Sequence, residues 1–123
     1  MQVEDIYASG YALYEGGKYR EAADCFRVLT LEEPSESRHW MGLAAAHQML
    51  AEYELALQAY ACAADLHPQN PYTHLHAAEC FFALGKKDDA AEALAACGQT
   101  TSEPHILDKI AVMKESFGGE HGQ

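Results

Sequence analysis

Residues 40–68 read W-M-G-L-A-A-A-H-Q-M-L-A-E-Y-E-L-A-L-Q-A-Y-A-C-A-A-D-L-H-P, and the pattern of this stretch recurs along the chain. Its central alanine, Ala56, has counterparts 34 residues away on either side, Ala22 and Ala90. The same interval links four further sets: Gly10, Ala44 and Ala78; Leu13, His47 and Phe81; Gly17, Ala51 and Gly85; and Phe26, Tyr60 and Leu94. A fixed interval of this length indicates tandem structural repeats.

The interval and the residue types match the tetratricopeptide (TPR) pattern, in which each repeat is a pair of antiparallel helices. The second repeat keeps Trp40, Leu43 and Pro68 at the expected places. The third repeat departs most, with His74 in the aromatic position and no closing proline. Small residues such as Ala56 let the two helices of a pair approach closely. We therefore expect an all-α fold of three tandem TPR repeats in a right-handed superhelix.

Glycine and proline set the expected limits of the helices. The first helices are predicted over residues 3–15, 37–50 and 71–84, and the second helices over residues 19–31, 53–66 and 88–98. The repeats then occupy residues 3–36, 37–70 and 71–102. An apolar stripe of Ile106, Ile110, Met113 and Phe117 predicts a capping helix over residues 103–117. Residues 1–117 would form a single domain, and residues 118–123 a disordered tail.

Composition and charge exclude several classes of protein. The formal net charge is −11, with 19 acidic and 8 basic residues, so a nucleic-acid backbone would be repelled. No apolar run approaches the length that spans a bilayer, and we expect no direct membrane insertion. The four cysteines, Cys25, Cys62, Cys80 and Cys97, each fall in an apolar helical run without a C-x-x-C motif. Buried, reduced thiols and a cytoplasmic location are therefore expected.

Residues for catalysis are lacking in the sequence. There is no H-E-x-x-H, no glycine-rich phosphate loop and no G-x-S-x-G. We therefore expect no enzyme activity and no cofactor. One alternative is kept open: His76, Glu79 and Cys80, at i, i+3 and i+4 of one helix, could hold a metal ion in a metal-dependent enzyme.

The first helices carry a second, partly aromatic stripe beside the stripe that faces the core. In a TPR stack, positions 2, 5, 9 and 12 of each repeat point into the concave face. Here these residues, with His76 beside them, are Glu4, Tyr7, Tyr11 and Tyr14; Arg38, Met41, Ala45 and Gln48; and Tyr72, Leu75, Glu79 and Phe82. Since the core stripe is already filled by other residues, this surface is expected to lack an intramolecular partner and to bind a peptide. Burial by a second copy or by the C-terminal helix is the alternative.

The composition of this predicted groove favours one kind of ligand. TPR domains that grip a C-terminal carboxylate use paired lysine and asparagine, whereas Tyr7, Tyr11, Gly42 and Tyr72 stand in those places here. Tyrosine offers a flat apolar ring with a hydrogen-bonding tip. Such a surface suits an extended segment with proline and leucine anchors.

The sequence resembles the class II chaperones of bacterial type III secretion, which escort translocator proteins. The resemblance runs from about residue 4 to residue 97, and its most specific element is the run His76-Ala77-Ala78-Glu79-Cys80. The other matching residues are Ile6-Tyr7, Gly17-Lys18-Tyr19, Ser37-Arg38, Gly42-Leu43, Gln48, Tyr53, Ala56 and Tyr60.

The resemblance implies a bacterial cytoplasmic protein that binds hydrophobic translocators before secretion. The client would present an extended N-terminal segment with a P-x-L-x-x-P-like pattern to the concave face. Groove residues implied by the resemblance are Tyr7, Tyr11, Tyr14, Gln48, Tyr72 and His76. Relatives carry a further N-terminal helical segment that contributes to dimerisation, whereas this sequence begins almost at the first repeat, and a homodimer stays open. The alternative function is a generic TPR interaction adaptor.

Overall fold

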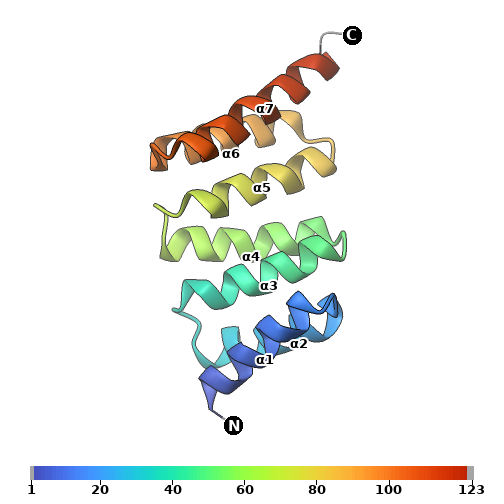
Figure 1. The fold of residues 1–123 in the computed structure, drawn as a ribbon, viewed down its shortest axis with the longest axis vertical. Coiled ribbons are helices and arrows are strands. Elements are labelled where there is room, and N and C mark those ends of the chain that lie inside the picture. Colours follow the sequence, from blue (N-terminus) through green and yellow to red (C-terminus); the bar gives the residue numbers. More distant parts are fainter. Residues whose placement is uncertain (1, 122–123) are drawn as a thin grey trace. The chain divides into compact units, whose positions relative to one another are not determined.

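A computed structural model describes the backbone of residues 2–121 and the side chains of residues 2–116. This part of the chain is all-helical, as the repeat pattern predicts (Figure 1). Its helices are α1 (Val3–Glu15), α2 (Tyr19–Glu32), α3 (Ser37–Met49), α4 (Tyr53–Leu66), α5 (Pro71–Ala83), α6 (Lys87–Thr100) and α7 (Pro104–His121). The limits of α1 to α6 agree with the predicted ones to within two residues.

Helix α7 extends beyond the predicted limit of the capping helix. The helix continues through Gly118 and Gly119 to His121, whereas a disordered tail was expected from residue 118. Glycine lowers helix stability by about 1 kcal/mol per residue, but it still supplies the N–H and C=O groups that the helical ladder needs. Residues 122–123, also part of the expected tail, lie outside the described residues.

The contacts divide the chain into two compact units, which are described separately. Unit 1, Met1–His67, holds α1 to α4, and unit 2, Pro68–Gln123, holds α5 to α7. The expectation of one domain over residues 1–117 stays a prediction. No helix among the described residues has both the length and the apolar character that crossing a membrane requires.

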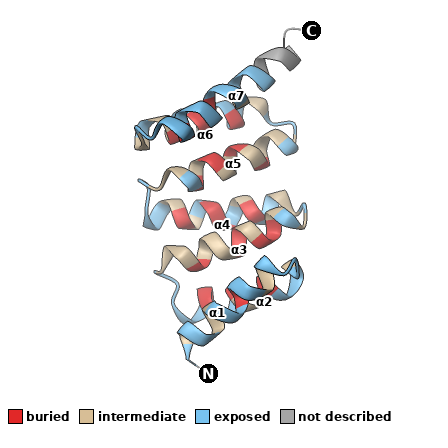
Figure 2. Ribbon diagram, viewed as in Figure 1, coloured by how far each residue is buried: buried red, intermediate tan, exposed pale blue. Residues whose placement is uncertain are grey.

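Unit 1 is held together by small residues where helices cross. Ala22 on α2, Ala44 on α3 and Ala56 on α4 have no exposed surface. Buried residues of α3 and α4 are red in Figure 2. Gly42 on α3 lies against the buried ring of Phe26 on α2, and a Cβ atom at Gly42 would stand only 2.4 Å from Phe26 Cε1. The 34-residue pattern did not reveal this close approach, because Gly42 is not a repeated position.

In unit 2, α5, α6 and α7 pack around one buried apolar cluster. Its buried members are Leu75, Ala78, Ala90, Leu94, Cys97, Ile106 and Ile110. Ile106 and Ile110 confirm the inward stripe of the capping helix, while the side chain of Phe117 lies outside the described part. The start of α5 is fixed by Asn70, whose Oδ1 accepts a hydrogen bond from the Tyr72 N–H at 3.0 Å, and by Pro71 in the first turn.

A polar contact recurs at the repeat junctions despite the change of residue type. In unit 1, Trp40 Nε1–H donates to the Pro34 carbonyl at 2.8 Å. In unit 2, His74 Nε2–H donates to the Pro68 carbonyl at 2.9 Å. His74 therefore replaces the usual tryptophan without losing the hydrogen bond that fixes the start of the repeat.

The turn inside each helix pair requires a left-handed residue. Gly17, Ala51 and Gly85 have φ of 79°, 59° and 76°, and the residue after each donates its N–H to a carbonyl five residues earlier. Alanine is disfavoured in this region because its Cβ crowds the following carbonyl, at a cost of about 1–2 kcal/mol.

Replacing Ala51 by glycine is therefore expected to stabilise the protein. Relief of the strain stabilises the folded state, but glycine also increases the entropy of the unfolded chain. The net gain should therefore be about 0.5–1 kcal/mol. The free energy of unfolding in urea measures it. An equal or lower value for Ala51→Gly would show that the alanine carries no strain in this turn.

Candidate functional site

In unit 1, the predicted stripes of α1 and α3 lie on one surface. Arg38 on α3 donates a hydrogen bond to Glu4 on α1, and its guanidinium carbon lies 4.4 Å from the centre of the Tyr7 ring. The Arg38 Nε is 3.2 Å from Glu36 Oε1, just before α3. Arg38 therefore connects the predicted stripes of these two helices.

Two of the three α1 tyrosines have intramolecular partners, contrary to expectation. The Tyr7 ring packs edge-on against Phe26, with 5.9 Å between centroids, and lies 5.7 Å from the buried His39 ring. Tyr14 meets Tyr19 edge-on at 5.3 Å, and burial is the main cause of its raised pKa. The aromatic side chains are large enough to reach α2 and α3 as well as the surface. These two rings are therefore partly core.

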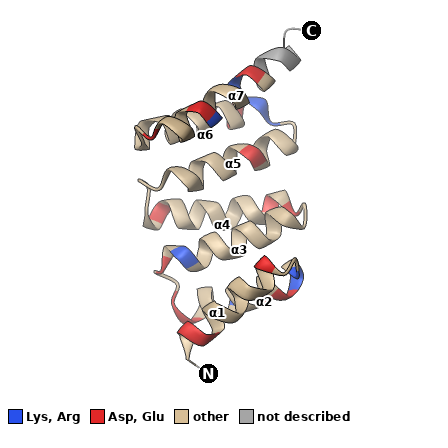
Figure 3. Ribbon diagram, in the orientation of Figure 1, with Lys and Arg blue, Asp and Glu red and all other residues tan. Residues whose placement is uncertain are grey.

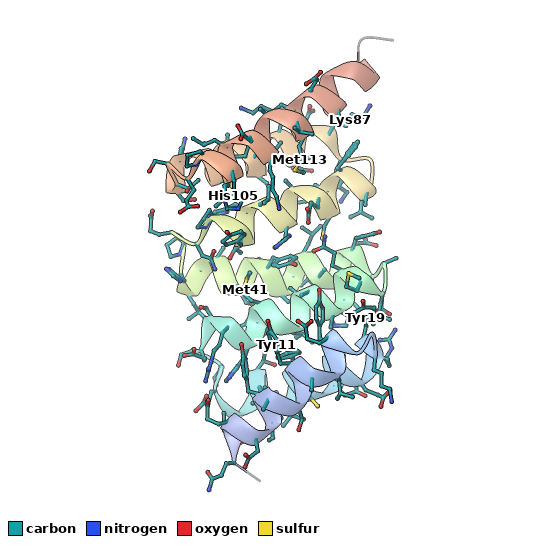
Figure 4. The ribbon with its side chains drawn as sticks, in the orientation of Figure 1. Tyr11, Tyr19, Met41, Lys87, His105 and Met113 are labelled. Atoms are coloured by element: carbon teal, nitrogen blue, oxygen red, sulfur yellow. The ribbon has the colours of Figure 1, made fainter. Side chains whose placement is uncertain are left out.

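Tyr11 is the open aromatic side chain of unit 1. It is 53% exposed, and its ring centroid lies 6.3 Å from that of Tyr7 (Figure 4). On α3, Met41, Ala45 and Gln48 are half-buried. The Gln48 side chain is oriented by Tyr60 of α4, whose hydroxyl donates to Gln48 Oε1 at 2.7 Å.

In unit 2, the α5 stripe is partly open and polar. Tyr72 is 41% exposed, and its ring stacks on His76 at 6.4 Å with an interplanar angle of 25°. His76 Nδ1–H donates to Glu79 Oε1 at 2.8 Å. Glu79 and Phe82 are half-buried.

Leu75 does not belong to the exposed stripe. It is only 1% exposed and is part of the unit 2 core beneath α7. For Leu75 the alternative of burial by the C-terminal helix applies, because Ile106 and Ile110 of α7 belong to the same cluster.

Two hollows between α5 and α7 were missed by the sequence analysis. One, of about 380 Å³, is lined by Glu79, Phe82, Ala83, Met113 and Ser116. The other, of about 320 Å³, is lined by Leu75, Glu79, Asp108, Lys109, Val112 and Met113. Met113 projects from α7 at this place (Figure 4). A signal existed: Lys109, Met113 and Ser116 follow Leu75, Glu79 and Phe82 by one more interval of 34 residues.

An ionic cluster ties the first two repeats together at the α3–α4 turn. Glu52 accepts hydrogen bonds from Arg20 Nη2 at 2.7 Å and from His47 Nδ1–H at 2.8 Å. These two hydrogen bonds lower the pKa of Glu52 from 4.5 to about 2, and the bond from Arg20 has the larger effect. Lysine and arginine residues are sparse along the ribbon (Figure 3), and Arg20 is one of only eight in the chain.

The lowered pKa of Glu52 predicts a pH dependence. A carboxyl whose pKa is lower in the folded state stabilises the protein above pH 4.5, and this contribution is lost as the pH falls toward about 2. Glu52→Gln should therefore be less stable than the original protein at pH 6, and the difference should shrink on acidification. Urea unfolding between pH 6 and pH 3 measures it, with Glu54→Gln as the control. A difference that does not change with pH would contradict the role of ionised Glu52.

The alternative metal site is not assembled by the folded chain. His76 and Glu79 are hydrogen-bonded to each other, while Cys80 has no exposed surface. The pKa of the Cys80 thiol is raised to about 12, mainly by burial. Within the described residues, no three His, Cys, Asp or Glu side chains are grouped so that they could hold a metal ion.

Comparison with known proteins places the chain in a family. A model of the tetratricopeptide repeat matches residues 7–71 and 50–104. The low calcium response locus protein H of Yersinia pestis is 32% identical over 92 residues, which is 75% of this chain and 55% of that protein. The chain thus spans about half the length of this curated relative.

Solved structures agree with that assignment. The type III secretion translocator chaperone SycD of Yersinia enterocolitica, in a structure described as an alternative dimer, aligns with a TM-score of 0.93 and 25% identity over 98% of this chain and 95% of that one. SycD was also solved with a peptide of the translocator YopD. PcrH of Pseudomonas aeruginosa aligns with a TM-score of 0.87 and 30% identity over 94% and 91% of the two chains. PcrH was also solved with the chaperone binding region of PopD.

The family model covers most of the repeats, and the similarity to PcrH extends over nearly the full length of both chains. The run from His76 to Cys80, which was the most specific element of the resemblance, lies on α5 beside the open Tyr72 ring. The chain belongs to the tetratricopeptide repeat proteins and, among them, to the family of the type III secretion translocator chaperones SycD and PcrH.

Proposed function

We propose that this protein is a translocator chaperone of a bacterial type III secretion system. It binds an extended N-terminal segment of a hydrophobic translocator in the cytoplasm and keeps the client soluble and competent for secretion. The binding is passive, without catalysis or a cofactor. Its family relatives SycD and PcrH, each solved with a segment of a translocator, support this function.

The observation that carries the proposal is that a first helix in each unit carries an open aromatic ring. Tyr11 and Tyr72 expose large rings, and half-buried Met41 and Phe82 lie on the same stripes of their helices. Rings of this kind accept proline and leucine side chains with little loss of conformational entropy. Three apolar anchors at about 1.5–3 kcal/mol each, less the cost of association, correspond to roughly micromolar affinity.

We propose as client-contacting residues those that the sequence analysis named, except Leu75. In unit 1, Tyr7 and Arg38 lie together, with the guanidinium carbon 4.4 Å from the centre of the ring. In unit 2, Tyr72, His76 and Glu79 form a separate group on α5. When a client segment occupies this protein, mass action favours the bound, extended form of the segment, because the chaperone binds only that form. A homodimer, the form in which SycD has been described, is compatible with this function.

The test is a calorimetric titration with the N-terminal segment of a translocator from the same bacterium. We expect one binding site and a dissociation constant near the micromolar range for the segment with its P-x-L-x-x-P-like pattern intact. A segment with the proline and leucine anchors changed to serine should bind at least about tenfold more weakly. Equal binding of both segments, or of neither, would favour a generic TPR adaptor with another ligand.

A further inference from the structure

The larger hollow between α5 and α7 has an apolar floor that is rigidly supported. We call the space lined by Glu79, Phe82, Ala83, Met113 and Ser116 the α5–α7 hollow. Phe82 and Met113 pack against the buried core cluster of unit 2, so the floor cannot easily collapse. A space of about 380 Å³ is large enough for one leucine or methionine side chain and part of the adjoining backbone.

Among the described residues that line this hollow, the charge has one sign. Glu79 is the charged residue among its lining side chains, and it also lines the neighbouring smaller hollow. Its side chain is 41% exposed, and His76 holds one of its oxygens at 2.8 Å. The carboxylate is thus positioned at the edge of an apolar space. Lys109 and Asp108 line the smaller hollow, which Glu79 also lines.

We propose that the α5–α7 hollow is a specificity subsite that takes an apolar client side chain next to a lysine or arginine, whose cation binds Glu79. The inference rests on the proposed function, because the ligand is a second anchor of the same client segment. Charge complementarity favours a basic neighbour: the hollow offers a carboxylate, and the chain carries a net charge of −11. A generic hydrophobic subsite would make no such distinction.

Three synthetic peptides test the subsite. Each is about 20 residues long, enough to extend over about 66 Å, and carries the P-x-L-x-x-P pattern at its centre. The first has Leu-Lys pairs at both ends, so that the direction of binding does not matter. The second has Leu-Gln pairs and the third has Ala-Lys pairs. We expect the Leu-Lys peptide to bind about threefold to tenfold more tightly than either of the others.

Glu79→Gln should bring the affinity ratio of the Leu-Lys peptide to the Leu-Gln peptide close to one, whatever its effect on the affinity for the Leu-Gln peptide itself. Asp108→Asn is the matched control, because it makes the same change of charge at the smaller hollow. It should alter the ratio by less than about twofold. Salt at about 0.5 M should also reduce the advantage, since it screens exposed charge pairs.

Methionine methyl NMR separates this inference from the proposed function. Met113 reports on the α5–α7 hollow, and Met41 reports on the α3 stripe. Both methyl signals should shift when the Leu-Lys peptide binds. A shift of Met41 without Met113, or equal affinities of the Leu-Lys and Leu-Gln peptides, would overturn the subsite while leaving the proposed function intact. Absence of binding by all three peptides would count against both.

Discussion

Replacing Tyr11 and Tyr72 together by alanine is expected to weaken binding of the translocator segment at least about 100-fold. Truncation of an aromatic anchor typically costs about 2 kcal/mol or more, and the two rings lie on different helices, α1 and α5. Tyr11 is 53% exposed and Tyr72 is 41% exposed, so the free energy of unfolding should change little. Calorimetric titration and urea unfolding measure the two quantities.

The matched control removes exposed apolar side chains from second helices. Leu31 on α2 is 76% exposed and Leu55 on α4 is 46% exposed. The Leu31→Ala, Leu55→Ala variant should bind the segment within about twofold of the original protein, because these residues are outside the proposed surface. If this control lost binding and the tyrosine variant kept it, the client would bind the second helices instead. Tyr7 is unsuitable for the test, since its ring also packs against Phe26.

The largest effect on stability is expected for Gly42→Ala. The added Cβ would stand 2.4–2.8 Å from three atoms of the Phe26 ring, which is only 2% exposed and has little room to move. We expect a loss of about 3 kcal/mol, the upper end for overpacked cores, and a decrease in Tm of roughly 10 °C. Thermal and urea unfolding measure it.

Gly98→Ala makes the same change of residue type but is expected to have the opposite effect on stability. Gly98 lies inside α6, and the nearest outside atom, Ile110 Cδ1, would be 3.9 Å from the new Cβ. Alanine should therefore stabilise the helix by up to about 1 kcal/mol. Adding Phe26→Leu to Gly42→Ala should recover part of the lost stability, because it removes the ring that the methyl group meets. If Gly42→Ala matched Gly98→Ala, α2 and α3 would not approach as closely as described.

The repeat interval predicted the fold well because it reflects local geometry. Each helix pair needs small residues at its crossing, as at Ala22 and Ala56, and a left-handed turn, as at Gly17 and Gly85. These demands act within about one repeat and therefore leave a regular record in the sequence. The junction between repeats is also local, which is why His74 could replace tryptophan and still bond to Pro68.

The site was harder to predict, because it depends on which surfaces neighbouring helices cover. Leu75 occupies a groove position in the repeat, but it is buried in the core cluster with Ile106 and Ile110 of α7. Tyr7 and Tyr14 also occupy such positions, yet they reach partners on neighbouring elements. Lys109, Met113 and Ser116 were missed because the C-terminal helix was considered as a cap or as a cover for the groove, and not as a helix that lines it. Extending the interval of 34 residues into α7 would have found them.

The structure of the protein with a bound translocator N-terminal segment tests the central claim most directly. We predict that the segment is extended and that its apolar side chains contact the Tyr11 and Tyr72 rings on the first helices. A segment bound to α2, α4 and α6, with both tyrosine rings still in water, would contradict the proposed binding surface.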